Sequence, residues 1–171
     1  MKSVMIVGVG GQGTLLASRV LGRVMLDAGY DVKVSEVHGM SQRGGSVVTY
    51  VRWGERVESP VINEGEADIL LAFEQLDTQK IDPMPVITGA ADYPAGLLEK
   101  IGAAGARLTA VDALRLAEEA GSQKAVNVVL IGAMASSLDI PEESWLAAIE
   151  KTVPAKFLEM NKRAFALGYR A

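Results

Sequence analysis

Cysteine is absent from this chain of 171 residues, and its absence excludes several classes of chemistry. Without cysteine the chain cannot form disulfides, zinc–thiolate sites, cysteine nucleophiles or iron–sulfur clusters held by its own side chains. A single histidine, His38, also excludes a metal site built from several histidines. The lack of cysteine fits a reducing compartment, so we expect the protein in the cytoplasm.

Charge and hydrophobic runs exclude two further classes of partner. The formal net charge is −4, and the lysines and arginines are scattered, so the sequence predicts no nucleic-acid partner. The longest apolar run, residues 128–135, is far too short to span a bilayer. The apolar stretch near the N-terminus ends too soon, at Gly8, for a signal peptide. We therefore expect no membrane partner.

Aromatic residues are also scarce, at 5% of the sequence. The core must therefore consist mainly of valine, leucine, isoleucine, alanine and methionine. Hydrophobic residues nevertheless make up 49% of the chain, which excludes a disordered protein. A length of 171 residues predicts a single domain covering residues 1–171.

The order of apolar segments predicts a Rossmann-like α/β fold with a mostly parallel sheet flanked by helices. Residues 4–7 form a short apolar run that ends at Gly8, as in a buried parallel strand. From Gln12 to Ala28 the apolar spacing is helical, and residues 31–37 again have the pattern of a strand. Strand, helix and strand at this spacing predict a βαβ unit with a right-handed crossover.

After the second strand the pattern departs from this rhythm. Residues 46–53 predict a strand that turns at residues 54–55 and pairs with a short strand at residues 56–58. We therefore expect a β-hairpin inserted after strand two. Further strands are expected at residues 67–72, 84–88 and 106–111. Helices are expected at residues 95–104, 113–120, 124–138 and 155–167, and another helix is expected to start within residues 139–143, with Asp139 as a possible cap, and to run to about Val153.

The first glycine loop, residues 8–13, has the spacing G-x-G-x-x-G directly between a predicted strand and a predicted helix. In this pattern Gly8 permits a tight turn, Gly10 lets a ligand approach closely, and Gly13 lets the helix pack on the sheet. A helix N-terminus attracts anions, whereas a purely structural use of the glycines is the alternative. Thr14 stands where a Walker A loop would require lysine. The candidate cofactor-binding residues are Gly8, Gly10, Gly11, Gln12 and Gly13.

The second glycine loop, residues 38–45, follows the second predicted strand, and we expect it at the same sheet edge as the first loop. The Arg43 guanidinium can bind a carboxylate or phosphate through two hydrogen bonds, and the neighbouring glycines let the backbone approach a ligand or partner. The alternative to such a binding role is that Arg43 is a surface arginine paired with a nearby glutamate. The candidate residues for contact with a ligand or partner chain are Glu36, His38, Gly39, Met40, Gln42, Arg43, Gly44 and Gly45.

Two of these residues raise rival functions. His38 titrates near neutrality, but no G-x-S-x-G elbow accompanies it, so a serine–histidine hydrolase is not expected and a hydrogen-bonded loop histidine is the alternative. Glu36 lies 23 residues after Gly13, close to where a dinucleotide-binding fold places the acid that binds ribose. A stand-alone NAD(P)-binding oxidoreductase is therefore a rival hypothesis. Against it, the second loop is cationic and leads into a predicted hairpin rather than a helix.

The helix expected at residues 124–138 combines apolar and small residues with one polar exception. Gly132 and nearby alanines and serines predict close packing of this helix in the core. Asn127 is a polar residue on the same helix, and if it is buried it needs hydrogen-bonding partners. We identify no catalytic constellation anywhere in the sequence.

Together, the two loops resemble a known family, the small subunit of 2-oxoacid:ferredoxin oxidoreductases. The resemblance is carried by Gly8-Val-Gly-Gly-Gln-Gly13, Ser35-Glu-Val-His-Gly-Met-Ser-Gln-Arg-Gly-Gly-Ser-Val47, Ser59-Pro60 and Glu66-Ala-Asp68. It extends to residues 127–132 and 161–169, so it covers nearly the whole chain. The first motif alone is weakly specific, whereas the second loop at its spacing from the first is much more specific. Its form is most similar to that of the indolepyruvate oxidoreductase beta subunit.

The resemblance implies a Rossmann-like domain within a larger enzyme that oxidatively decarboxylates a 2-oxoacid to an acyl-CoA and reduces ferredoxin. This chain would then be a non-catalytic subunit that is inactive alone and binds no cofactor by itself. Thiamine diphosphate, Mg²⁺, iron–sulfur clusters and coenzyme A are implied for the assembled hetero-oligomer, with the thiamine and the clusters on a large alpha subunit. The loop residues would contact coenzyme A, the substrate or that subunit. A scaffold whose loops only bind protein is a third hypothesis.

Overall fold

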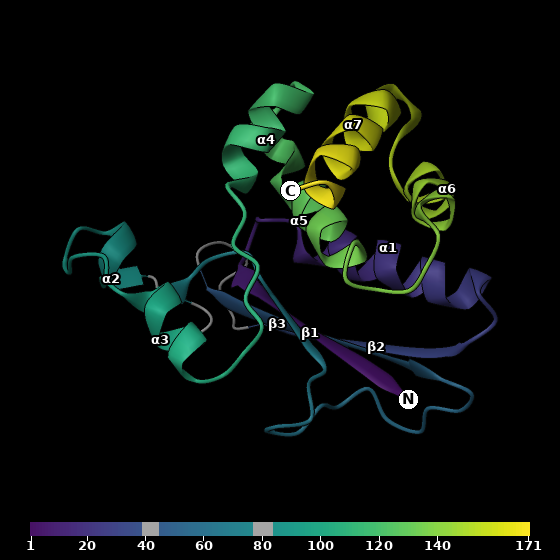
Figure 1. Ribbon diagram of the computed structural model, residues 1–171, viewed down its shortest axis with the longest axis horizontal. Helices are drawn as coiled ribbons and strands as arrows, with labels where there is room; N and C mark the ends of the chain where they lie inside the picture. Colours follow the sequence, from purple (N-terminus) through teal and green to yellow (C-terminus); the bar gives the residue numbers. More distant parts are fainter. Residues whose placement is uncertain (39–44, 77–83) are drawn as a thin grey trace.

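The computed structural model describes residues 1–38, 45–76 and 84–171, and Figure 1 shows their arrangement. The strands are β1 (Lys2–Val9), β2 (Asp31–His38), β3 (Ser46–Gly54) and β4 (Ile69–Ala72). The α-helices are α1 (Thr14–Asp27), α2 (Met84–Ile87), α3 (Leu97–Ala103), α4 (Ala113–Ala120), α5 (Val126–Ala135), α6 (Glu142–Thr152) and α7 (Leu158–Tyr169). Short 3-10 helices, η2 (Gln123–Ala125) and η3 (Ala155–Phe157), lead into α5 and α7.

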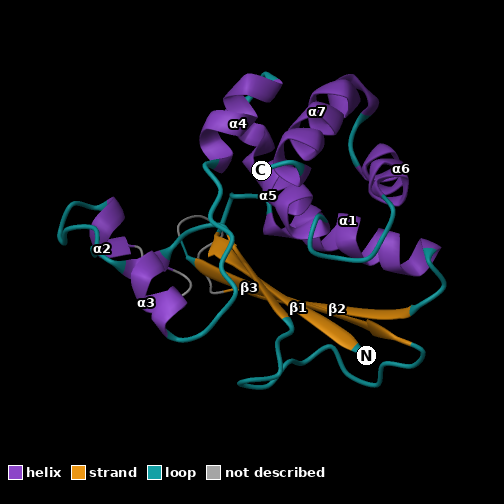
Figure 2. Ribbon diagram, in the orientation of Figure 1, coloured by secondary structure: helices purple, strands orange, loops and turns teal. Residues whose placement is uncertain are grey.

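These strands form a mixed sheet in the order β2-β3-β1-β4 (Figure 2). Within the described residues only β1 and β4 pair in parallel, whereas β3 runs antiparallel to both of its neighbours. The prediction of a mostly parallel sheet is therefore wrong, although the mixed α/β class is confirmed. The chain passes from β2 to β3 through residues 39–45. A connection this short cannot make a parallel crossover, which needs a dozen or more residues.

The hairpin predicted after strand two is not confirmed. Residues 55–58, which the structure describes, form no strand, and β3 instead pairs along nearly its whole length with β1 and β2. The Val57 N–H, in the segment expected to be the partner strand, donates to Asp31 Oδ2 at 2.8 Å. This hydrogen bond and the burial of the Val57 side chain, which is 3% exposed, hold the segment in place of a strand ladder.

Two other predicted strands are wrong, whereas the predicted helices are found close to their expected positions. The segment expected as a strand at residues 84–88 contains the helix α2, and residues 106–111, all of them described, form no regular element. Leu108 in the latter segment is 42% exposed, so a strand there would lack a well-buried face. The helices α3 to α7 match the predicted ones within a few residues. In the described parts of the chain, none of the helices is both long and apolar enough to cross a membrane.

Helices cover one face of the sheet, and the main hydrophobic core lies between these two layers (Figure 1). The period of two in β3 places alternate side chains against the helices. Its buried residues are Val47, Thr49, Val51 and Trp53. The predicted apolar face of α1 packs against them, with Val20, Leu21, Val24 and Met25 buried.

Helices α5 and α7 meet backbone to backbone at two glycines. A Cβ on Gly168 would lie 2.7 Å from the Val129 carbonyl carbon, and a Cβ on Gly132 would lie 2.8 Å from Tyr169 N. Real Cβ atoms essentially never approach another heavy atom this closely, so both positions require glycine. This contact confirms the close packing expected for the small residues of α5.

Stacked aromatic rings extend the same core toward α6. The ring centroids of Trp145 and Phe165 lie 6.2 Å apart, and those of Phe165 and Tyr169 lie 5.7 Å apart. Trp145 comes from α6 and the other two rings come from α7, so the stack joins the two helices. Few aromatic residues are present in the chain, and three of them meet at this one place.

The opposite face of the sheet is partly covered by the loop that joins β3 to β4. Arg52 Nη1 donates to the Val61 carbonyl oxygen of this loop at 2.6 Å. Ser3 Oγ donates to the Glu66 carbonyl oxygen at 2.8 Å, and the Ser3 N–H donates to Asp68 Oδ2 at 2.7 Å. These bonds fix the loop to the amino-terminal part of β1, away from the edge where the glycine loops lie.

Candidate functional site

The first glycine loop and the two described ends of the second loop, His38 and Gly45, lie at one edge of the sheet. Both β1 and β2 run antiparallel to β3, so they point in the same direction and end at the same edge. In the ladder, Val9 is opposite Ser46 and His38 is opposite Val47. The Gly10 N–H donates to the Gly45 carbonyl oxygen at 2.8 Å, which joins the first loop to the end of the second. The end of the first loop and the end of the second therefore meet at this edge, and they do so through β3 rather than through direct pairing of β1 with β2.

The first loop is closed by its own glutamine. The Val9 N–H donates to Gln12 Oε1 at 2.8 Å, and the Gln12 N–H donates to the Val9 carbonyl oxygen at 3.1 Å. Gly11 and Gly13 have φ values of 101° and 92°, in the region that favours glycine. The turn is therefore made by these two glycines and held by Gln12.

The roles expected for two of the glycines need correction. Gly8 lies within β1, and a Cβ there would come within 2.9 Å of atoms in Gln12 and Thr14. It therefore makes room for neighbouring side chains rather than forming a tight turn. Gly13 was expected to let α1 pack on the sheet, but the atoms that a Cβ there would meet belong to Asn127 of α5. Its contact is with a second helix.

Several hydrogen-bond donors at the start of α1 have no acceptor. In the described part of the chain, no acceptor receives the N–H groups of Gly11, Gly13, Thr14 or Leu15. Gly13 is the N-cap of α1 and has no side chain that could cap these groups. The positive end of the helix dipole and convergent N–H groups attract anions. The first N–H groups of every α-helix lack an intrahelical acceptor, so anion binding by the first loop stays a prediction beside a purely structural use of its glycines.

Two buried polar side chains lie beside these N–H groups. Thr14 is 5% exposed and Asn127 is 6% exposed. Asn127 Oδ1 accepts the Val128 N–H at 2.9 Å, and its Nδ2 occupies the space that a Cβ on Gly13 would need. The sequence showed Asn127 as a polar residue on an apolar helix, but it gave no sign that its neighbour would be Gly13.

The second loop is described only at its two ends. Gly39, Met40, Gln42, Arg43 and Gly44 lie outside the described residues, so their predicted contacts stay predictions. The backbone of His38 ends β2, and Gly45 bonds to Gly10.

Glu36 is exposed near the end of β2, where it is opposite Thr49 of β3. Because β3 lies between β1 and β2, Glu36 is two strand spacings from β1, about 10 Å in place of the 4.8 Å between adjacent strands. In a dinucleotide-binding half-domain the acid-bearing strand is adjacent to the glycine-loop strand. The strand order therefore weakens the NAD(P) hypothesis.

The end of β4 adds residues to this edge that the sequence analysis missed. The Phe73 N–H donates to the Val7 carbonyl oxygen at 2.9 Å, so the chain leaving β4 stays beside β1. Glu74 comes next, and one of its carboxylate oxygens accepts the hydroxyl of Tyr93. This bond ties the segment before α3 to the sheet edge. No local motif marks Glu74, because its partner is distant in the sequence.

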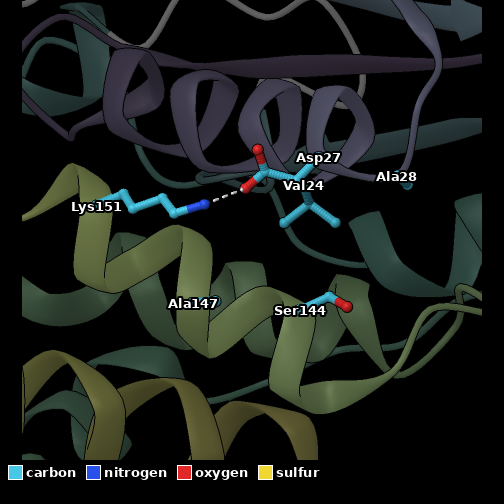
Figure 3. Close-up of a pocket in the computed structure, with 6 residues that line it drawn as sticks. All are labelled: Val24, Asp27, Ala28, Ser144, Ala147 and Lys151. Carbon is cyan, nitrogen blue, oxygen red and sulfur yellow. Dashed lines mark hydrogen bonds and ion pairs between the residues drawn. The ribbon is translucent and has the colours of Figure 1, made fainter.

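A pocket of about 420 Å³ lies at the other end of α1 (Figure 3). It is lined by Val24, Asp27, Ala28, Ser144, Ala147 and Lys151. From Thr14 to Val24 the helix rises about 15 Å, so the pocket is well separated from the glycine loops. Lys151 Nζ donates to Asp27 Oδ2 at 2.8 Å, and each charge satisfies the other. The pocket offers no free catalytic group, and the glycine-loop edge remains the candidate site.

The Asp27–Lys151 pair predicts a loss of stability in acid. Hydrogen bonds from Lys151 and then Arg23 lower the pKa of Asp27 below its ordinary value of 3.8. A lowered pKa means that the stabilisation is complete above about pH 4 and is lost as the pH falls through the folded-state pKa. We expect Asp27→Asn to reduce the fall of Tm below pH 4, followed by circular dichroism, with little change near pH 7 because the pair is exposed.

Asp139→Asn, an exposed residue before α6, is the control for this prediction. It should leave the acid limb as steep as in the unaltered chain. Equal steepness in Asp27→Asn would contradict the role of the ion pair.

Metal binding finds no support in the described residues, where no group of three or more histidine, aspartate or glutamate side chains could hold an ion. This finding covers only residues 1–38, 45–76 and 84–171.

Comparisons with known proteins agree on one family. Residues 3–171 match the family described as pyruvate ferredoxin/flavodoxin oxidoreductase. The chain is 42% identical to indolepyruvate oxidoreductase subunit IorB of Thermococcus kodakarensis, over 99% of this chain and 95% of that protein. It is 40% identical to the subunit of the same name from Pyrococcus horikoshii, with the same coverage.

A solved structure is similar in fold. The gamma subunit of a keto/oxoacid ferredoxin oxidoreductase from Geobacter sulfurreducens superimposes with a TM-score of 0.72, at 24% identity, over 99% of this chain and 97% of that one. At this identity the likeness supports the fold alone. The mixed sheet and the helices on one face are thus an arrangement found in a solved protein.

Proposed function

Because the chain belongs to the pyruvate ferredoxin/flavodoxin oxidoreductase family, we propose that it is the non-catalytic small subunit of a 2-oxoacid:ferredoxin oxidoreductase. The preferred substrate is indolepyruvate or a related arylpyruvate. The observation that carries this proposal is the 42% identity, over nearly the full length of both chains, to a subunit named for indolepyruvate. The enzyme would decarboxylate the 2-oxoacid, transfer the acyl group to coenzyme A and pass two electrons to ferredoxin.

The chemistry of this reaction requires groups that this chain does not supply. The chain has no cysteine to hold a cluster. The iron–sulfur clusters would therefore be held by a large alpha subunit. We assign thiamine diphosphate and Mg²⁺ to the same subunit and propose that the hetero-oligomer is cytoplasmic. The naming of several relatives as subunits supports a multi-subunit enzyme.

The glycine-loop edge is the part of this subunit that we assign to the shared active site. The first loop supplies backbone donors for an anion, and the Gly10–Gly45 bond joins it to the last residue of the second loop. We assign ligand binding to Gly8, Gly10, Gly11, Gln12 and Gly13, and contact with coenzyme A, the substrate or the alpha subunit to Glu36, His38, Gly39, Met40, Gln42, Arg43, Gly44 and Gly45. A stand-alone NAD(P) oxidoreductase is the weaker alternative, because β3 separates Glu36 from the first loop.

The proposal predicts that the purified chain alone is colourless and cannot reduce a viologen dye with any 2-oxoacid. Co-expression with the cysteine-rich alpha subunit should give a brown complex that reduces the dye when indolepyruvate and coenzyme A are both present. Omitting this chain from the co-expression is the control and should abolish the activity. Turnover by this chain alone, or failure of the two chains to assemble, would overturn the proposal.

A further inference from the structure

We propose that Asn127 is a ligand-binding residue whose amide Nδ2, together with the N–H groups at the start of α1, binds a phosphoryl group. This inference rests on the proposed function, because it gives the first glycine loop a class of ligand and adds to it a residue from a distant helix. Asn127 lies on α5, 114 residues after Gly13 in the chain. No residue of α5 belongs to the glycine motif itself.

The orientation of the Asn127 amide is fixed by its own helix. Oδ1 accepts the Val128 N–H at 2.9 Å, which leaves Nδ2 directed at Gly13, the N-cap of α1. In the described part of the chain Nδ2 donates no hydrogen bond, although the residue is only 6% exposed. The side chain is thus held almost entirely inside the protein while its Nδ2 keeps its hydrogen-bonding capacity, and a ligand at the start of α1 could supply the acceptor.

Other free donors at the same place indicate the class of ligand. The N–H groups of Gly13, Thr14 and Leu15 have no acceptor among the described residues. The hydroxyl of Thr14, a residue that is 5% exposed, forms no hydrogen bond there either. A carboxylate presents two oxygens, whereas a terminal phosphoryl group presents three strong acceptors. The number of donors around the N-terminus of α1 therefore matches a phosphoryl group better than a carboxylate.

A packing role for Asn127 is the competing explanation, and one substitution separates the two. Asn127→Asp has nearly the same shape, so it fills the same space against Gly13, but it replaces the donor with an acceptor and adds a negative charge. Its charge would repel an anion whatever the role of Asn127, so the variant that separates the two roles is Asn127→Ala, which removes the amide without adding a charge. A packing residue would tolerate Asn127→Ala without any effect on anion binding. A phosphoryl-binding residue would not tolerate it.

The experiment is a titration of the full ¹⁵N-labelled chain with pyrophosphate, followed by coenzyme A, with the amide signals of Gly11, Gly13, Thr14 and Leu15 as the readout. We expect these signals to shift in the unaltered chain. Asn127→Ala should weaken pyrophosphate binding by about ten-fold or more, as expected for the loss of a hydrogen bond to a charged group. Asn127→Asp should weaken it further through the added charge.

The matched control is Asn161→Ala, which removes the other buried asparagine. Asn161 Nδ2, in α7, donates at 2.8 Å to the carbonyl oxygen of Phe157, the N-cap of that helix, so this variant loses a hydrogen bond but no ligand donor. It should bind pyrophosphate like the unaltered chain. Circular dichroism confirms that each variant is folded before it is titrated.

The outcomes separate this inference from the subunit assignment. Competition between coenzyme A and pyrophosphate would identify coenzyme A as the source of the phosphoryl group, and pyrophosphate binding without competition would point to another phosphorylated ligand. If pyrophosphate shifts none of the four signals, or if Asn127→Ala binds it as tightly as the unaltered chain, the inference is wrong. Assembly with the alpha subunit tests the proposed function independently of these results.

Discussion

Gly168→Ala is expected to destabilise the chain by about 3 kcal/mol, at the upper end of the range for overpacked cores. The added Cβ would lie 2.7 Å from the carbonyl carbon of Val129 and closer still to its oxygen. Backbone atoms cannot rotate away as a flexible side chain can, so α5 and α7 would have to separate. Thermal unfolding should show a fall in Tm of about 6–12 °C for a chain of this length.

Gly102→Ala is the matched control, because it makes the same change in a helix where no heavy atom lies within 4 Å of the new Cβ. Alanine is favoured over glycine in a helix, so the control should leave Tm unchanged or raise it slightly. Gly132→Ala should reproduce the effect of Gly168→Ala from the other side of the contact. Similar melting temperatures for Gly168→Ala and Gly102→Ala would show that the two helices are not in backbone contact.

The helices were largely predictable from the sequence because their signals are local. Periodic apolar residues define α1, and acidic residues follow a proline at the start of α6. The segments at residues 84–88 and 106–111 were expected to be strands but are not. Short apolar runs are a weak signal for a strand, because they occur in helices and loops as well. Only their tertiary surroundings decide between these structures.

The strand order could not be predicted from hydrophobic pattern alone. A buried strand has the same apolar run whichever strand lies beside it, so the pattern of β1 contains no information about β3. The length of the connection between the two strands, residues 39–45, did contain information about the strand order, because a connection this short excludes a parallel crossover between β2 and β3. The expected βαβ unit is therefore split by an antiparallel strand, although both of its parallel strands still end at one edge.

The candidate site was predictable only where its signal is local in the sequence. The glycine spacing located the first loop and the N-terminus of α1, where we propose an anion site. The contact between Gly13 and Asn127 could not be predicted, because it depends on how α5 crosses α1. Glu74 likewise joins the edge only because β4 pairs in parallel with β1.

The second large effect is expected at Arg43, which lies outside the described residues and whose role is predicted from the sequence. Gly45, two residues later in the chain, is bonded to the first loop through Gly10. We therefore expect the Arg43 guanidinium to act at the same edge as the free N–H groups of α1. Its ligand would be a coenzyme A phosphate, the substrate carboxylate or an acidic side chain of the alpha subunit.

In the assembled enzyme Arg43→Ala should lower turnover by about ten- to a hundred-fold while this chain stays folded. The loss of one charge-assisted hydrogen bond, worth roughly 1.5–3 kcal/mol, sets this range. Arg43→Lys should recover only part of the activity, because lysine cannot form the paired hydrogen bonds of a guanidinium. Arg115→Ala, which removes an exposed arginine paired with Glu119 on α4, is the control and should have no effect.

Turnover is measured as indolepyruvate-dependent dye reduction, and subunit content by gel filtration. Full assembly with unchanged turnover would remove Arg43 from the site, whereas loss of assembly with a folded monomer would make the second loop a docking element.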